Sequence, residues 1–216
     1  FTGHPLLEDN NKDKIDLSQI IKNHKKIISI FPGSRQSEIN VLLPILIDFV
    51  KMMNEKYKDI FFVFHSTSQH NQSTQDRLIK EGFKNCGSIS DEIIKSQVLK
   101  SSTFAVSKSG TISLEICNAK VPSIIIYKMN IINFFIVKML VKVKFANIIN
   151  IAADEEIIPE LLQSNCNSKN IFDRVNSLLE DQKSLKEQVD KSQEIIKKFK
   201  TNKSSEIAAS ILSNSL

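Results

Sequence analysis

The chain has 216 residues, enough for one large domain, and its content of 41% hydrophobic and 25% charged residues is ordinary for a soluble globular protein. Its 29 Lys and Arg outnumber 24 Asp and Glu, and the net charge of +5 favours an anionic partner such as phosphate, nucleic acid or an acidic membrane, although a solvated surface accounts for most of these lysines. The three cysteines are widely spaced and form no Cys/His cluster, so neither a disulfide framework nor a zinc site is supported.

The first 25 residues are polar, and we expect an irregular segment with a short helix at 17–23. The segment lacks the positive and apolar regions of a signal peptide. It opens without Met, so we expect the chain to begin inside a larger protein.

Apolar strands and helical patterns then alternate along the chain. The expected elements are a strand at 26–31, a turn at Pro32-Gly33-Ser34-Arg35, a helix at 39–53, a strand at 59–64, a helix at 72–81 ending at Gly82, a strand at 85–89, a helix at 91–101 capped by Ser90, a strand at 103–107, a helix to Ala119 and a strand at 123–127. Pro44 predicts a kink or a late start of the first helix. Near-continuous apolar strands that alternate with helices predict an α/β fold, with a parallel sheet covered on both faces.

The segment 129–143 is apolar, but it is too short and too interrupted by lysine to span a bilayer, which takes about 20 residues. One interpretation places it on an anionic membrane surface, with Lys138, Lys142 and Lys144 toward the headgroups. The other is a buried helix of the α/β core. After it we expect a turn of helix at 156–162 and then a helical tail whose apolar stripe packs along the domain.

The stretch from Ser107 to Glu115 reads as a strand, a glycine turn and a helix. Gly110 permits a turn that a side chain would obstruct, and Ser109 and Thr111 can cap the helix. A helix start attracts phosphate, and Glu115 stands one turn deeper on the face of Thr111. The arrangement suits a nucleoside diphosphate, with the carboxylate accepting ribose hydroxyls. The alternative is an ordinary strand-to-helix turn with a solvated Glu.

A second turn, Pro32-Gly33-Ser34-Arg35, follows the first strand. Ligands of open parallel sheets bind at the carboxyl ends of the strands, so we expect both turns at one rim. Arg35 is one of only three arginines, and a guanidinium can grip a diphosphate through two parallel hydrogen bonds. Walker and GxGxxG glycine patterns are absent. If the two turns lay on opposite sides of the molecule, the assignment of a sugar nucleotide would fail.

Other catalytic signatures are absent: the sequence has no nucleophile elbow, no HExxH and no recognisable pair of catalytic carboxylates. His65 follows a predicted strand, so it either reaches the ligand edge of the sheet or simply ends the strand with a polar group. The other three histidines are scattered.

Several motifs occur in an order that resembles lipid-A-disaccharide synthases. They are Phe1-Thr2-Gly3-His4-Pro5-Leu6, Phe31-Pro32-Gly33-Ser34-Arg35-Gln36-Ser37-Glu38-Ile39, Ser109-Gly110-Thr111 with Glu115, Tyr127-Lys128-Met129, Asn150 and Pro159-Glu160-Leu161-Leu162-Gln163. The resemblance covers nearly the whole chain. It implies the C-terminal half of a GT-B glycosyltransferase: a junction at 1–25, a Rossmann-like nucleotide-sugar domain at 26–168 and a helical tail at 169–216.

The resemblance also implies a reaction. Such enzymes transfer 2,3-diacylglucosamine from its UDP derivative to lipid X with inversion, giving the β-1,6 disaccharide of lipid A and UDP. The donor would bind this half, while the acceptor half, with the general base, would precede Phe1; the isolated half would be inactive. The expected partners are UDP-2,3-diacylglucosamine, lipid X and the anionic cytosolic face of the bacterial inner membrane, without nucleic acid, metal or cofactor.

The resemblance assigns roles to individual residues. It places Ser34, Arg35, Ser109, Gly110 and Thr111 at the diphosphate, with Arg35 as the catalytic residue, Glu115 at the ribose, Asn150, Glu160 and Gln163 in the donor pocket and His4 at the junction between halves. Two departures from the family pattern affect the expected pocket shape: Lys108 stands where a small residue is commoner, and Ile149 replaces a proline.

Two further functions fit the same architecture: a UDP-sugar 2-epimerase, and a non-catalytic UDP-binding or membrane-binding module. An epimerase needs no surface for acyl chains, so the apolar segment flanked by lysines speaks against it. Calorimetry with UDP distinguishes a nucleotide-binding protein from a plain membrane binder, and an assay with the acceptor half supplied distinguishes an enzyme from a module.

Overall fold

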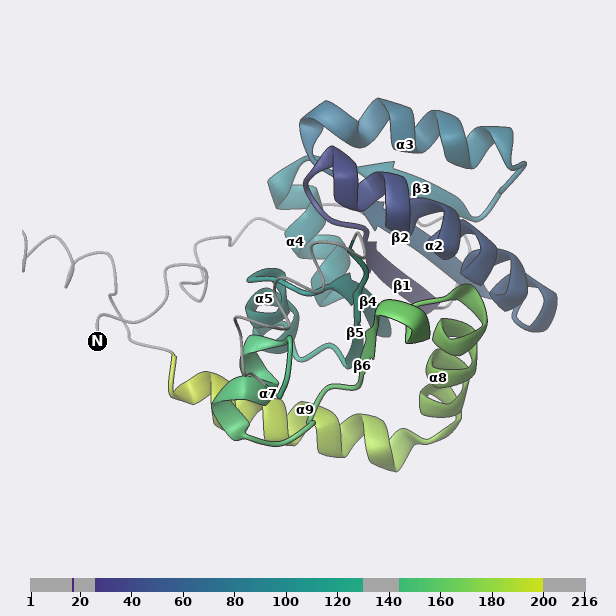
Figure 1. Cartoon of the computed structure of the whole chain (residues 1–216). Coiled ribbons are helices and arrows are strands. Elements are labelled where there is room, and N and C mark those ends of the chain that lie inside the picture. Colours follow the sequence, from purple (N-terminus) through teal and green to yellow (C-terminus); the bar gives the residue numbers. More distant parts are fainter. Residues whose placement is uncertain (1–16, 18–25, 130–143, 200–216) are drawn as a thin grey trace, which may run out of the picture.

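The computed structural model describes residue 17 and residues 26–129 and 144–199 (Figure 1). Six parallel strands form one sheet in the order β3-β2-β1-β4-β5-β6. The strands are β1 (Lys26–Phe31), β2 (Ile60–His65), β3 (Cys86–Ile89), β4 (Phe104–Lys108), β5 (Ser123–Tyr127) and β6 (Glu160–Leu162). The α/β fold with a parallel sheet is therefore confirmed.

Helices cover both faces of this sheet, as Figure 1 shows. They are α2 (Gln36–Lys56), α3 (Ser68–Lys80), α4 (Glu92–Lys100), α5 (Ile112–Asn118), α7 (Ile148–Ala153), α8 (Ser168–Glu180) and α9 (Gln182–Lys197), with a 3₁₀ turn, η2 (Gln163–Asn165). Side chains of β1 alternate between the faces. Ile28 and Ile30 pack with α2 and α8, whereas Ile27 and Phe31 pack with residues of α4. Burial on both sides explains why the strands are almost wholly apolar.

The C-terminal helices pack against the rest of the domain in two hydrophobic clusters. Ile171 and Val175 of α8 are buried with the residues of α2, and Ile195 and Ile196 of α9 are buried with Leu114 of α5. The predicted packing of the apolar stripe along the domain is thus confirmed for the described residues. Other sequence-based expectations fall outside those residues: the segment 1–25 apart from Leu17, nearly all of the apolar segment 129–143, and the chain beyond 199.

Several predicted boundaries are wrong. The helix α2 begins at Gln36, so Pro44 does not delay its start, and α3 begins at Ser68 rather than at 72. The cap of α4 is Asp91, whose carboxylate accepts the N–H of Ile94, and not Ser90. The expected turn of helix at 156–162 contains the short edge strand β6, which pairs with β5. A strand of three residues is too short to show the alternation of apolar and polar residues by which a strand is predicted from sequence.

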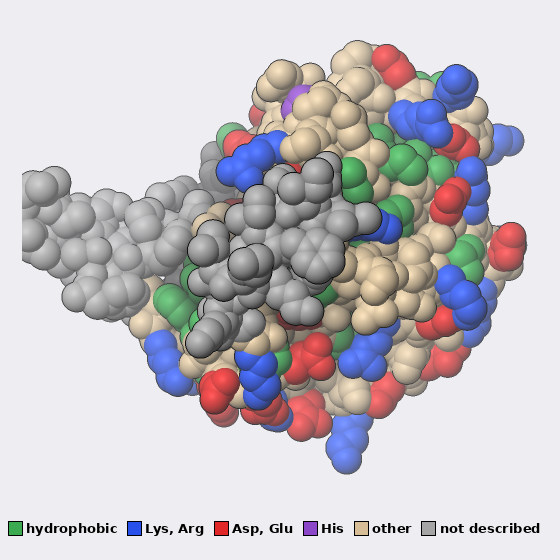
Figure 2. All heavy atoms as spheres, viewed as in Figure 1, with side chains coloured by type: hydrophobic (Ala, Val, Ile, Leu, Met, Phe, Trp, Pro, Cys, Tyr) green, Lys and Arg blue, Asp and Glu red, His purple; other side chains and the backbone are tan. Residues whose placement is uncertain are grey.

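Charged side chains of both signs are mixed on the face that Figure 2 shows. Several lysines there and elsewhere form surface ion pairs, including Lys191 with Glu155 and Lys169 with Asp173, both at 2.7 Å. This pattern agrees with a solvated surface as the explanation of these lysines. Among the described helices, none combines the length and hydropathy that crossing a bilayer requires.

Candidate functional site

A cavity of about 230 Å³ opens at the carboxyl ends of the central strands. Since β1 and β4 are adjacent, with Phe31 paired to Ser107, the turns that follow them emerge side by side. Gly33 and Ser34 of the first turn and residues 108–111 of the second line the same cavity. The prediction that the two turns share one rim is confirmed.

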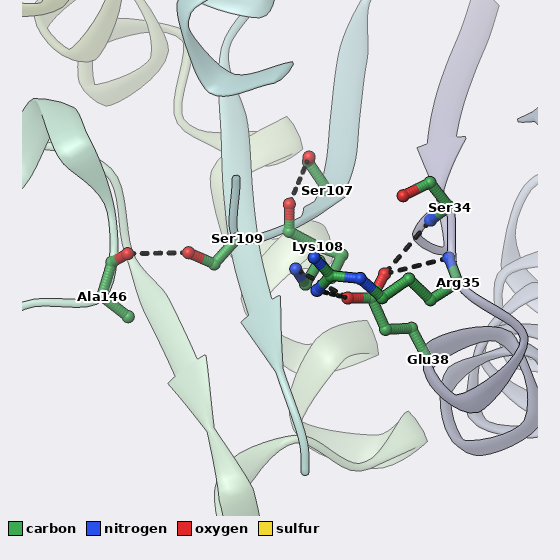
Figure 3. A network of polar contacts seen from close by, with 7 residues as sticks. All are labelled: Ser34, Arg35, Glu38, Ser107, Lys108, Ser109 and Ala146. Carbon is green, nitrogen blue, oxygen red and sulfur yellow. Dashed lines mark hydrogen bonds and ion pairs between the residues drawn. The ribbon is translucent and has the colours of Figure 1, made fainter. Parts of the chain in front are cut away.

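The first turn is already occupied by a carboxylate of the protein itself, that of Glu38. Its Oε2 accepts the backbone N–H groups of Ser34 at 3.1 Å and Arg35 at 3.4 Å (Figure 3). Gly33 has a φ of +110°, and a Cβ there would lie 2.4 Å from this oxygen. The glycine therefore allows Glu38 to fold back onto the turn.

Arg35 does not line the cavity in this structure. Its side chain is 78% exposed, and its Nη1 lies 3.4 Å from Oε1 of Glu38. The structure therefore brings the turn of Arg35 to the site but leaves the guanidinium directed mainly to solvent.

Glu38 also receives a second cation, the ammonium of Lys108, at 3.0 Å from Oε1. Both side chains are largely shielded, with 15% of Glu38 and 19% of Lys108 exposed. Burial raises the pKa of Glu38, but the hydrogen bond and charge of Lys108 and the two backbone N–H groups outweigh it and lower that pKa below its ordinary value. Glu38 is thus ionised at neutral pH.

The hydrogen bonds of the second turn, at residues 108–111, differ from those that the sequence predicted. The hydroxyl of Ser109 donates to the carbonyl of Ala146 at 2.7 Å, and Thr111 makes no side-chain cap on α5, so capping by these two residues is wrong. The steric argument for Gly110 is wrong as well, because its φ is not positive and a Cβ there would meet nothing within 4 Å. The backbone N–H groups of Gly110 and Thr111 find no acceptor within the described part of the chain.

Glu115 lies where the helical spacing predicts, on the wall of the cavity that also includes Thr111. Burial raises the pKa of its carboxyl, the charge of Glu92 raises it further, and Lys95 opposes both. Glu115 and Lys95 also line an adjacent pocket of about 100 Å³, here called the extension, which shares Phe31 and His65 with the cavity. A ligand at the glycine turn therefore has this second pocket beside it.

Of the two interpretations of His65, the structure supports the one that places it at the ligand edge of the sheet. The side chain lines the cavity and stacks on Phe31, with ring centroids 4.1 Å apart. Its Nε2 lies 2.8 Å from the hydroxyl of Ser29, which lies 2.7 Å from that of Ser102. Burial, with a smaller effect of Lys95, lowers the pKa of His65 to about 3. The ring is therefore neutral at physiological pH.

The tautomer of His65 follows from this chain of hydrogen bonds. The Ser102 hydroxyl donates to the carbonyl of Val98 at 2.8 Å, so its oxygen must accept from Ser29. Ser29 has then used its only hydrogen and accepts from Nε2–H of His65. The other ring nitrogen, Nδ1, is an acceptor that is buried without a partner among the described residues. Sequence reasoning missed Ser29 and Ser102, because one inward serine in a strand gives no signal of a distant partner.

Asn150 and Glu160 do not line the cavity; they brace the segment behind it. Oδ1 of Asn150 accepts the N–H groups of Ile157 and Ile158, and its Nδ2 donates to Oε1 of Glu160 at 2.8 Å. Glu160 in turn accepts the N–H of Ala146 at 2.8 Å. Because the carbonyl of Ala146 accepts from Ser109, these residues reach the glycine turn through one backbone segment.

Gln163 lies beside the end of the described segment at Met129. Its Oε1 accepts the Met129 N–H at 3.3 Å, its backbone has a φ of +52°, and its Nε2 is buried without a partner among the described residues. His4, which the resemblance placed at the junction between halves, lies outside the described residues.

The described part of the chain offers no activated thiol. Burial raises the pKa of Cys86 and Cys117 to about 12 and that of Cys166 to about 11. All three thiols are protonated at neutral pH, which makes them poor nucleophiles. In the same residues, no group of three or more His, Cys, Asp or Glu side chains is arranged to hold a metal ion.

Comparison with solved structures agrees with this architecture. The S. aureus MnaA–UDP co-structure matches with a TM-score of 0.62 and 15% identity over 95% of this chain and 51% of that one. UDP-GlcNAc 2-epimerase from Neisseria meningitidis, bound to UDP-GlcNAc, matches with a TM-score of 0.62 and 15% identity over 88% and 45%. A trehalose-6-phosphate synthase structure matches with a TM-score of 0.58 and 12% identity over 96% and 49%. At such identities these likenesses show only the Rossmann-like, GT-B type of fold.

Comparison of sequences is more specific. The lipid-A-disaccharide synthase of Rickettsia prowazekii (strain Madrid E) is 34% identical, over 98% of this chain and 57% of the relative. That of Sulfurihydrogenibium sp. (strain YO3AOP1) is also 34% identical, over 92% and 54%. The chain thus spans a little over half the length of these curated relatives. The family model described as lipid-A-disaccharide synthetase matches residues 1–213, and the chain belongs to the lipid-A-disaccharide synthase family.

Proposed function

We propose that this chain is the donor-binding half of a glycosyltransferase of lipid A biosynthesis. The enzyme would transfer 2,3-diacylglucosamine from its UDP derivative to lipid X, forming the disaccharide and UDP. The observation that carries the proposal is the convergence of both turns on one cavity at the carboxyl ends of β1 and β4 in a chain of this family. This edge of an open parallel sheet is where such folds bind nucleotides.

The geometry suits a UDP group laid across the rim. The diphosphate would meet the N–H groups of Gly110 and Thr111 beside Ser34 and Ser109, while Glu115, one turn along α5, would accept the ribose hydroxyls. The stacked rings of His65 and Phe31 form a flat aromatic surface in the direction in which the nucleoside would extend.

Catalysis would depend on stabilising the charge that develops on the departing UDP. Backbone N–H groups directed at the diphosphate provide that stabilisation, and Arg35 would add to it by turning from solvent toward the phosphates. The general base that deprotonates the acceptor hydroxyl would come from the preceding half of the enzyme. Reaction at the anomeric carbon then inverts its configuration.

Asn150, Glu160 and Gln163 would shape the donor pocket from behind. The first two fix the segment that accepts a hydrogen bond from Ser109, and Gln163 holds the backbone at Met129. These residues would control where the sugar can lie next to the diphosphate.

Because its proposed substrates are lipids, the enzyme would act at the cytosolic face of the bacterial inner membrane, as a peripheral protein. The net charge of +5 agrees with an anionic surface. The apolar, lysine-containing segment 129–144 is the part of the sequence with the composition to contact such a surface.

Two experiments test the proposal. Isothermal titration calorimetry of the chain with UDP, with ADP as the control, should show binding that prefers UDP. Turnover of UDP-2,3-diacylglucosamine and lipid X should then require both this chain and the preceding half of the enzyme. Binding without turnover in the completed enzyme would favour a non-catalytic module, and absence of UDP binding would refute the donor-site assignment.

A further inference from the structure

Lys108 joins the two turns of the cavity, and its position is unusual for a surface lysine. It is the last residue of β4 and directly precedes Ser109 and Gly110. Its ammonium lies 3.0 Å from Glu38 at the start of α2, whose carboxylate folds back onto the neighbouring turn (Figure 3). It also lies 5.4 Å from the ring centroid of Tyr127. With 19% of its side chain exposed and a carboxylate of 15% exposure as its partner, Lys108 is enclosed at the cavity, unlike a lysine in an ordinary surface ion pair.

The first turn cannot supply positive charge to a ligand in this arrangement. Its N–H groups at Ser34 and Arg35 already point at the carboxylate of Glu38, and the Arg35 guanidinium is 78% exposed. Glu38 also brings a negative charge to the cavity wall, which repels phosphate unless a cation offsets it.

Two cations line the described part of the cavity, Lys95 and Lys108. Lys95 lies at the extension beyond Phe31, where it pairs with Glu92 at 2.8 Å. Lys108 lies at the glycine turn itself. An ammonium has three donors, so Lys108 can keep its bond to Glu38 and still donate to a phosphate oxygen.

We propose that Lys108 is a diphosphate-binding residue of this site, which donates from its ammonium to the ligand and offsets the negative charge of Glu38 beside it. The inference deepens the proposed function and rests on it. Lysine binds phosphate as a point charge, so an arginine at this position should work less well because its planar fork requires a different approach.

A purely structural role must be separated from this one. If Lys108 acted only by tying the turns together, removing either partner of the ion pair would weaken the site in the same way. If Lys108 contacts phosphate, Lys108→Met and Glu38→Gln have opposite effects, because Gln keeps an oxygen for the backbone N–H groups while it removes the competing negative charge.

The experiment is calorimetry of the chain with UDP and with uridine. Lys108→Met should weaken UDP binding about tenfold or more, as expected for a lost charge-assisted hydrogen bond, and leave uridine binding unchanged. Glu38→Gln should bind UDP at least as tightly as the wild type. Lys51→Met is the matched control, because Lys51 is paired with Glu81 at 2.8 Å, lies outside the cavity lining and carries the same charge.

The outcomes separate the two proposals. A wild-type chain that binds UDP while Lys108→Met binds it equally well would overturn the role of Lys108 alone. So would equal losses for UDP and uridine, or matching losses in Lys108→Met and Glu38→Gln, since these indicate a structural bridge. A wild-type chain that binds neither compound would overturn the proposed function itself, and the inference with it.

Discussion

Glu160 and Ser109 are joined through the backbone of a single residue, Ala146. The carboxylate of Glu160 accepts the Ala146 N–H at 2.8 Å, and the Ala146 carbonyl accepts the Ser109 hydroxyl at 2.7 Å. Glu160 also accepts the N–H of Asn147 at 2.9 Å. One carboxylate on the edge strand β6 therefore fixes the segment against which the glycine turn of β4 is anchored.

Replacing Glu160 should damage both stability and the site. Glu160→Ala leaves the N–H groups of Ala146 and Asn147 without their acceptor, which should lower the free energy of unfolding by about 1–3 kcal/mol. Because Ser109 depends on the same segment, the affinity for UDP should fall as well. Chemical denaturation and calorimetry measure the two effects.

The matched control is Glu187→Ala. That carboxylate is 60% exposed and lies 3.9 Å from Lys191, so its loss should change neither quantity measurably. If Glu160→Ala were destabilised but bound UDP like the wild type, the link from Glu160 to the glycine turn would have no functional consequence.

The two glycines of the rim should respond oppositely to alanine. Gly33→Ala introduces a Cβ at φ +110° and 2.4 Å from Glu38, so it should destabilise the fold by more than about 1 kcal/mol. Gly110→Ala places its methyl in open space at an ordinary φ, so the melting temperature should change little. UDP affinity should nevertheless fall in Gly110→Ala if phosphate approaches the backbone there. Thermal denaturation and calorimetry test both; a large loss of stability in Gly110→Ala would contradict the geometry.

The sequence predicted the sheet well, because burial on both faces produces apolar runs such as 60–64 that need no long-range information. It also predicted the shared rim, since the turns after Phe31 and Ser107 follow strands that had to be parallel. The prediction was wrong at β6, because three half-buried residues are too few to show the alternating pattern of a strand. It was also wrong at the cap of α4, because Ser90 and Asp91 are both residue types that cap helices well.

The details of the site depended on contacts between distant residues. Nothing local reveals that Glu38 folds back onto the first turn or that its partner is Lys108, 70 positions away. The same holds for Asn150, which sequence resemblance placed in the pocket and whose amide oxygen accepts the N–H groups of Ile157 and Ile158. The residue types indicated which chemistry was possible, but only the structure shows which of these groups already form hydrogen bonds or ion pairs within the protein.

His65 should make stability depend on pH in an identifiable range. Its pKa is about 3 in the folded chain against an ordinary value of 6.5, so between these values the unfolded chain binds more protons. The stability should therefore be lost as pH falls from about 6.5 toward 3, at up to about 1.4 kcal/mol per pH unit.

His65→Phe isolates this contribution. Phenylalanine can retain the stacking on Phe31, and Ser29 can still donate to Ser102. Urea denaturation at several pH values measures the free energy of unfolding of His65→Phe and of the wild type. As the pH falls, the wild type should lose more of this free energy than the variant. Parallel curves from pH 7 to pH 4 would show that His65 is not held neutral by burial.

Arg35 should matter for turnover more than for binding UDP in the ground state. Its guanidinium is 78% exposed and outside the cavity lining, and we propose that it turns toward the diphosphate during the reaction. If it does so as charge develops on the leaving UDP, Arg35→Ala in the complete enzyme should lower kcat by about 10²-fold or more, with a smaller change in the Kd of UDP. Arg77→Ala is the control, because Arg77 pairs with Glu81 on the surface of α3 at 3.1 Å. Steady-state assays and calorimetry of both variants measure kcat and UDP affinity. Wild-type turnover in Arg35→Ala would show that this residue has no part in the mechanism. Equal losses in kcat and in UDP affinity would show that it acts only in binding.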